Sequence, residues 1–104
     1  MRMLLKLTIP AAKGNQAIAD GTVQRIVQNT LATLKPEAAY FFPSEGKRGG
    51  FIVFDLADPS QIPAITEPLF HALDAEITLT PVMSGEDLAK GLSQIGQGGS
   101  GQAS

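Results

Sequence analysis

The sequence predicts an α+β domain whose strands and helices follow in the order β-α-β-β-α-β. Its 104 residues are long enough for one domain, and the 43% that are hydrophobic can fill one core. Apolar and polar residues alternate near the start of the chain and again around residues 76–82, which is typical of half-buried strands. Between these segments, apolar residues recur at helical spacing in two longer stretches.

The first half is expected to hold one strand and one clear helix. Residues 3–9 alternate as a strand with one strongly apolar face. Residues 11–20 are ambiguous, with Asn15 as a possible cap of a short helical turn. Thr22 is expected to cap a helix that ends before Pro36, because the residue preceding a proline avoids the α region. The apolar stripe of this helix is Val23, Ile26, Val27, Leu31 and Leu34.

The middle of the chain is expected to form a β-hairpin. Residues 39–42 predict a short aromatic strand and residues 44–50 its loop. Residues 51–56 are the least ambiguous strand of the chain.

A second helix and an edge strand are expected next. Asp58 or Ser60 caps the helix, which carries an apolar stripe as far as Leu73. Pro68 falls inside it and predicts a kink. Pro81 places the following strand at an edge of the sheet, because proline cannot donate to a neighbouring strand.

The end of the chain is expected to leave the domain. Ser84 and Asp87 fit the capping box of a short helix through Leu92. Residues 93–104 are rich in Gly, Ser and Gln, which is typical of a flexible tail. The predicted organisation is therefore a domain over residues 1–92 and a tail over residues 93–104.

This order of elements predicts a ferredoxin-like plait. Its antiparallel sheet has the strand order 4-1-3-2, with both helices on one face. The other face is left uncovered. The residues expected on this open face are Leu4, Lys6, Thr8, Tyr40, Phe42, Phe51, Val53, Asp55, Glu76, Thr78, Thr80 and Val82.

The open face predicts a homodimer. Its aromatic and aliphatic part is too apolar to leave in water as one patch, whereas Lys6, Asp55 and Glu76 are too polar for a dry core. Two such faces packed together would bury the apolar part and enclose a partly polar cavity, as a dimeric α/β barrel. A simpler interpretation makes Lys6 and Glu76 an ordinary cross-strand ion pair.

The second half also resembles a known family. Three motifs are similar to the muconolactone isomerase family: Phe51-Ile52-Val53-Phe54-Asp55, Pro68-Leu69-Phe70 and Glu76-Ile77-x-x-Thr80-Pro81. More broadly they resemble the dimeric α/β barrels, which include cofactor-independent monooxygenases. The resemblance covers residues 48–83 well and the first half by layout, and it implies pairing of two plaits through their sheets. It transfers no catalytic residue, because the chain has no tryptophan and one histidine, and the pocket residues of such enzymes are not recognisable.

Seven residues are candidates for a site. Four are candidates for moving a proton: Lys6, Tyr40, Asp55 and His71. Three are candidates for binding a ligand: Arg48, Phe51 and Glu67. The ordinary alternatives are packing for the tyrosine, and a solvated surface position for the arginine, the glutamate and the histidine.

The composition disfavours several kinds of partner. A net charge of −2 offers no electrostatic grip on nucleic acid or anionic lipid. Residues 47–54 partly match an RNA-binding strand, but Gly49 stands where an aromatic ring would stack on a base. The glycine pattern at residues 96–101 follows no strand and opens no helix, so it predicts no dinucleotide site. With no cysteine, one histidine and no clear carboxylate cluster, we expect no metal site, and we expect no cofactor. The lack of cysteine fits a reducing compartment and no apolar run is long enough for a membrane span, so we expect a cytoplasmic location.

Three functions remain open. The favoured one is a small-molecule-binding dimeric α/β barrel whose organic ligand is unknown. The alternative is a cofactor-independent isomerase or monooxygenase, in which one base moves a proton and nearby donors hold an enolate oxygen. The third is a structural interaction domain. A base with a perturbed pKa in a closed cavity would favour the enzyme.

Overall fold

The alternating segments form one antiparallel sheet of four strands in the computed structural model, which describes residues 1–102. The strands are β1 (Arg2–Ile9), β2 (Ala38–Ser44), β3 (Lys47–Asp55) and β4 (Glu76–Pro81). Their order is β2-β3-β1-β4, which is the expected 4-1-3-2 read from the opposite edge. The proline-bearing strand lies at an edge, as predicted.

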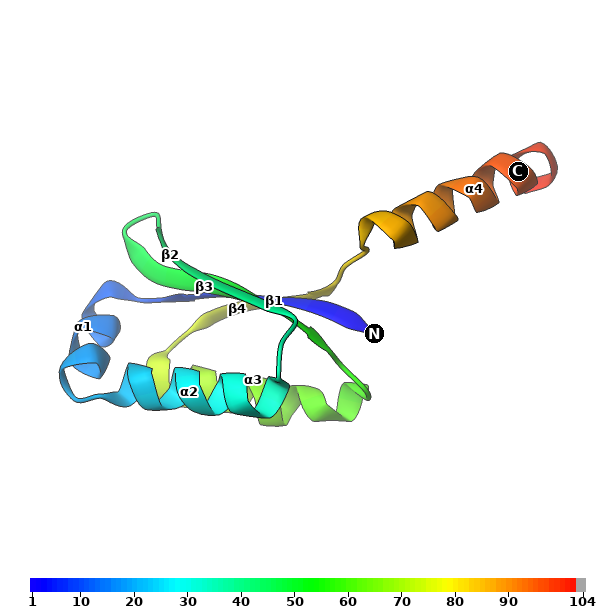
Figure 1. The fold of residues 1–104 in the computed structure, drawn as a ribbon. Coiled ribbons are helices and arrows are strands. Elements are labelled where there is room, and N and C mark those ends of the chain that lie inside the picture. The colour runs from blue at the N-terminus through cyan, green and yellow to red at the C-terminus, as the bar shows by residue number, and fades with distance from the viewer. Residues whose placement is uncertain (103–104) are drawn as a thin grey trace.

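Three helices cover one face of this sheet (Figure 1). They are α1 (Ala11–Ala19), α2 (Thr22–Leu34) and α3 (Ile62–Leu73), the last preceded by the 3₁₀ turn η1 (Pro59–Gln61). The core lies between the two layers. It includes the apolar side of β1 as predicted, together with central residues of β3 and α3: Met3, Leu5, Leu7, Ile9, Ile52, Phe54, Leu69 and Leu73.

The hairpin between β2 and β3 is tighter than expected. Glu45 and Gly46 form the whole connection, with positive φ angles of 53° and 78°. Two such residues are typical of a type I′ turn, whose twist matches that of the flanking strands. Consequently residues 47–50, expected in the loop, extend β3 and pair with β1 and β2.

The helices of the first half differ from expectation at their starts. Helix α1 begins directly after Pro10, so Asn15 lies within it and caps nothing. Helix α2 begins at Thr22, but its cap position is Gly21. The side chain of Asp20 accepts a hydrogen bond from the backbone N–H of Thr22 at 2.9 Å, in place of a threonine cap.

Two predicted capping motifs are confirmed. Asp58 accepts from the backbone N–H of Ser60 at 2.8 Å and so caps η1. Ser84 and Asp87 bond reciprocally, each side chain accepting from the other residue's backbone N–H, at 3.1 and 3.0 Å.

The last helix is longer than expected and stands away from the sheet (Figure 1). Helix α4 runs over Gly85–Gln102, so it continues through most of the stretch expected as a tail. Residues 103–104 of that stretch lie outside the described residues. Arg2 joins the start of α4 to the sheet, with Nη1 3.3 Å from Asp87 and Nε 2.6 Å from Glu37.

Candidate functional site

The register of the strands arranges the open face in three rows. One row is Tyr40, Phe51, Lys6 and Thr78; the next is Phe42, Gly49, Thr8 and Glu76; the third is Ala38, Val53, Leu4 and Thr80. The apolar side chains therefore gather over β2 and β3, and the polar ones over β1 and β4. No element within residues 1–102 covers this face (Figure 1).

The apolar part is an aromatic ridge formed by Tyr40, Phe42 and Phe51. The ring of Phe51 meets both neighbours edge to face, with ring centres 6.2 Å from Tyr40 and 5.3 Å from Phe42. Tyr40 is 62% exposed and Phe42 36% exposed. A rigid, exposed aromatic cluster of this kind is typical of a surface that binds something.

The polar end of the same face comprises Lys6, Thr8, Lys47, Glu76 and Thr78. Thr8 Oγ1 donates a hydrogen bond of 2.9 Å to Glu76 Oε1, and Lys47 Nζ lies 3.3 Å from the same oxygen. These two donors, the threonine hydroxyl first, lower the pKa of Glu76 below its ordinary value. A depression of about 300 Å³ lies among the side chains of this end.

The expected ion pair between Lys6 and Glu76 is wrong. Lys6 lies opposite Thr78, whereas Glu76 lies one row away, opposite Thr8. Glu76 pairs with Lys47 instead. Lys6 takes part in none of the ion pairs formed within the described part of the chain.

The chemistry of the polar end suits binding better than proton transfer. Two ammonium groups, an ionised carboxylate and two threonine hydroxyls can hold a small polar molecule in a fixed orientation. A carboxylate whose pKa is lowered is a weaker base, so Glu76 is poorly suited to take a proton from carbon.

The structure separates the seven candidate residues. Lys6, Tyr40 and Phe51 lie side by side in one row of the open face, as expected. Asp55 belongs to the same strand as Phe51 but lies four residues further on, about 13 Å along β3. Its carboxylate is held by the amino terminus of Met1 at 2.8 Å, so it does not join Lys6 in a site.

Glu67 and His71 lie on the helix side and contact each other. His71 Nε2 is 3.1 Å from Glu67 Oε1 within one turn of α3, and both side chains are largely exposed. Neither reaches the open face, because α3 covers the opposite side of the sheet. Arg48 also points to the helix side, since it lies two and four residues before Gly50 and Ile52 in β3 and so shares their face.

Four of the five members of the polar end are not among the sequence candidates: Thr8, Lys47, Glu76 and Thr78. The sequence pattern places Lys47 in the hairpin loop, gives the two threonines no role on the open face, and offers Glu76 only as an ion-pair partner of Lys6. The sequence feature that indicates the position of Lys47 is the pair Glu45-Gly46. A two-residue turn at this pair fixes the register and puts Lys47 on the same side of β3 as Phe51. No group of three potential metal ligands occurs among the described residues.

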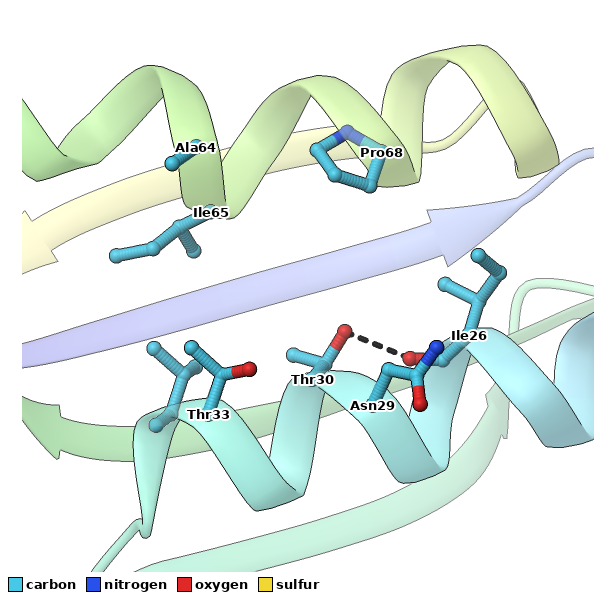
Figure 2. A pocket seen from close by; sticks show the side chains of 8 residues that line it. Ile26, Asn29, Thr30, Thr33, Ala64, Ile65 and Pro68 are labelled. Atoms are coloured by element: carbon cyan, nitrogen blue, oxygen red, sulfur yellow. Dashed lines mark hydrogen bonds between the residues drawn. The ribbon is translucent and has the colours of Figure 1, made fainter.

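A smaller depression of about 160 Å³ lies between α2 and α3 (Figure 2). Ile65 and Pro68 of α3 face Ile26 and Thr30 of α2 across it. The hydroxyl of Thr30 is already used, donating to the backbone oxygen of Ile26 at 2.8 Å. This seam has no charged residue in its lining and is a weaker candidate than the polar end.

The sequence has a clear family relationship. A family model described as "Domain of unknown function (DUF3303)" matches residues 1–96. The chain belongs to this family. The DUF3303 match spans the whole sheet, its three covering helices and the first part of α4. No curated protein matches the sequence.

Two solved structures resemble this DUF3303 protein. A formyltetrahydrofolate deformylase from Pseudomonas putida KT2440 is 15% identical, with a TM-score of 0.53 over 94% of this chain and 39% of that one. A formyltetrahydrofolate deformylase from Burkholderia mallei ATCC 23344 is 16% identical, with a TM-score of 0.48 over 94% and 38%. The chain thus spans less than half of each protein, and the first likeness shows the fold alone. No helix in the described range is long and apolar enough to cross a membrane.

Proposed function

We propose that this DUF3303 protein binds a small organic molecule in a dimeric α/β barrel formed by two open sheet faces. The observation that carries the proposal is the aromatic ridge standing next to the polar end on an uncovered face. Together with Phe42 and Phe51, Tyr40 at 62% exposure forms a contiguous aromatic patch of a kind that monomers rarely leave in contact with water. A second copy would bury the ridge, because a twofold dimer brings the same surface of both chains into contact.

The ligand class follows from what such pairing would enclose. The depression of about 300 Å³ at the polar end would face the partner's sheet and lose much of its contact with water. Lys6 and Glu76 present opposite charges there, with threonine hydroxyls between them. A small polar molecule that carries an anionic group and a hydrogen-bond donor fits this arrangement.

The resemblance to the muconolactone isomerase family supports the mode of pairing. It covers the two strands and the helix that include Phe51, Pro68 and Glu76. It carries over no catalytic residue, and the carboxylate of Glu76 is a poor general base because its pKa is lowered by Thr8 and Lys47. We therefore propose binding without catalysis.

Light scattering coupled to size exclusion tests the pairing. The wild type is expected to elute as a dimer at micromolar concentration, and Phe51→Glu as a folded monomer by circular dichroism. Phe70→Glu is the matched control, because Phe70 is 40% exposed on α3, on the other side of the sheet. A monomeric wild type, or equal dissociation by both variants, would refute the proposed interface.

A thermal-shift screen tests the ligand. Lactones, hydroxylated aromatics and small carboxylates are compared on the wild type, Lys6→Met and Lys13→Met, the last on α1. Hits that stabilise the wild type and Lys13→Met but not Lys6→Met would support a site at the polar end. Hits that stabilise all three equally would place binding elsewhere.

A further inference from the structure

A groove of about 630 Å³ opens on the helix side of the sheet, between α2 and the hairpin end of β2 and β3. Gly50 stands between Leu7 and Phe41 in one row of this side, and its lack of a side chain lets the Phe41 ring lie close over the strand. Gly50 is required, since a Cβ at this position would overlap the carbonyl oxygen of Tyr40 and come within 2.8 Å of the Phe41 ring. The volume lies in the range typical of sites for small organic ligands.

The walls of the groove are mainly apolar. Val23 and Val27 of α2 line one side, Leu7 and Ile9 of β1 the floor, and Phe41 the far side. Phe41 is 50% exposed, so a large part of its ring is open to an occupant. The polar side chains of the lining are Gln24, Gln28 and Arg48.

Arg48 is the one charged residue of this lining, and α1 fixes its position. Its Nη1 donates a hydrogen bond of 3.0 Å to Asn15 Oδ1. Gly14 makes the approach possible, because a Cβ there would lie 2.9 Å from the same nitrogen. The partner is a neutral amide, and Arg48 appears in none of the ion pairs found within residues 1–102. A guanidinium has five N–H donors, so most of its donors stay available for an anion.

We propose that this groove binds an amphipathic organic carboxylate. The apolar chain or ring would lie along Val23 and Val27, and the carboxylate would accept hydrogen bonds from the guanidinium of Arg48. The positive charge without an acidic partner selects an anion, and the apolar lining selects its hydrocarbon part. The site is distinct from the polar end, because Phe41 and Arg48 lie on the opposite face of the sheet from Phe51 and Lys6. Phe42 of the aromatic ridge also lines the groove.

Calorimetric titration with decanoate and with decanol, each below its aggregation limit, tests this assignment. Arg48→Gln is expected to weaken decanoate binding about tenfold, as for loss of a charge-assisted hydrogen bond, and to leave decanol unchanged. Val27→Phe fills the groove and is expected to weaken both ligands. Arg25→Gln is the matched control, because Arg25 is an exposed arginine of α2 outside the lining, and it is expected to change neither.

Amide chemical-shift mapping places the bound decanoate independently of affinity. Perturbations are expected on α2, Phe41 and Arg48, and their persistence in Phe51→Glu would separate this groove from the proposed dimer site. Perturbations confined to Lys6 and Phe51 would overturn the assignment. Equal losses for Arg48→Gln and Arg25→Gln, or decanol bound as tightly as decanoate, would also overturn it.

Discussion

Thr8 on β1 donates its hydroxyl to Oε1 of Glu76 on β4 at 2.9 Å, directly across the sheet. Lys47 on β3 reaches the same oxygen at 3.3 Å. One carboxylate therefore connects three strands at the polar end. Because both contacts favour the ionised form, the pKa of Glu76 is lowered in the folded state.

The first prediction concerns the pH at which this connection is lost. A carboxyl group whose folded pKa is lowered stabilises the fold above its unfolded pKa, near 4.5, and loses that contribution as the pH falls through the lowered value. NMR titration of the Glu76 carboxyl is expected to give a higher pKa in Thr8→Val than in the wild type. The same pKa in both proteins would show that the hydroxyl does not stabilise the ionised form.

A second prediction tests the crowding at Gly50. Gly50→Ala is expected to lower the free energy of unfolding by about 1–3 kcal/mol, because the added methyl group meets the backbone of Tyr40 and the ring of Phe41. Gly91→Ala in α4 is the control, since its Cβ would point into open space. It is expected to be neutral or slightly stabilising in urea unfolding, by up to about 1 kcal/mol. Equal effects of the two substitutions would contradict the close approach.

A third prediction concerns the pair on α3. Glu67→Ala and His71→Ala are expected to change the free energy of unfolding by no more than about 0.5 kcal/mol, because exposed pairs one helical turn apart contribute little. Neither change is expected to alter the oligomeric state or the thermal-shift hits. If His71→Ala kept its melting temperature but lost every thermal-shift hit, His71 would have a functional role and this prediction would be wrong.

The fourth prediction is that residues 96–104 are dispensable for folding. Helix α4 stands away from the sheet, and its apolar side chains Leu88, Leu92 and Ile95 are exposed. Removing residues 96–104 is expected to leave the melting temperature nearly unchanged, as measured by circular dichroism. A fall of more than a few degrees would show that the end of α4 packs against another part of the assembly.

The strands with strong alternation could be predicted in detail from the sequence. In β1 the contrast between Met3, Leu5, Leu7 and the intervening residues is large, so the buried face is unambiguous. Pro81 predicted an edge position for β4, because proline has no backbone N–H to donate to a neighbouring strand. The faces of these two strands placed Lys6 and Glu76 on the open side, although not opposite each other.

The hairpin and the groove could not be predicted in the same way. Gly49 and Gly50 have the composition of a turn, yet the structure uses them where neighbouring backbones approach closely. Extending β3 by these residues put Arg48 on the helix face, because successive strand residues point to opposite sides. The glycine-rich stretch after Leu92 has low helix propensity, so α4 beyond that residue contradicts local propensity.

Arg2 contacts both Glu37 and Asp87, and so links the direction of α4 to the strength of two surface ion pairs. Its contacts with Glu37 and Asp87 are exposed, and dissolved ions weaken the attraction between exposed charges as the ionic strength rises. Added salt should therefore loosen the joint at Asp87 while the buried sheet stays intact. Helix α4, about 27 Å long from 18 residues at 1.5 Å each, is therefore expected to hold its direction less tightly as the salt concentration rises.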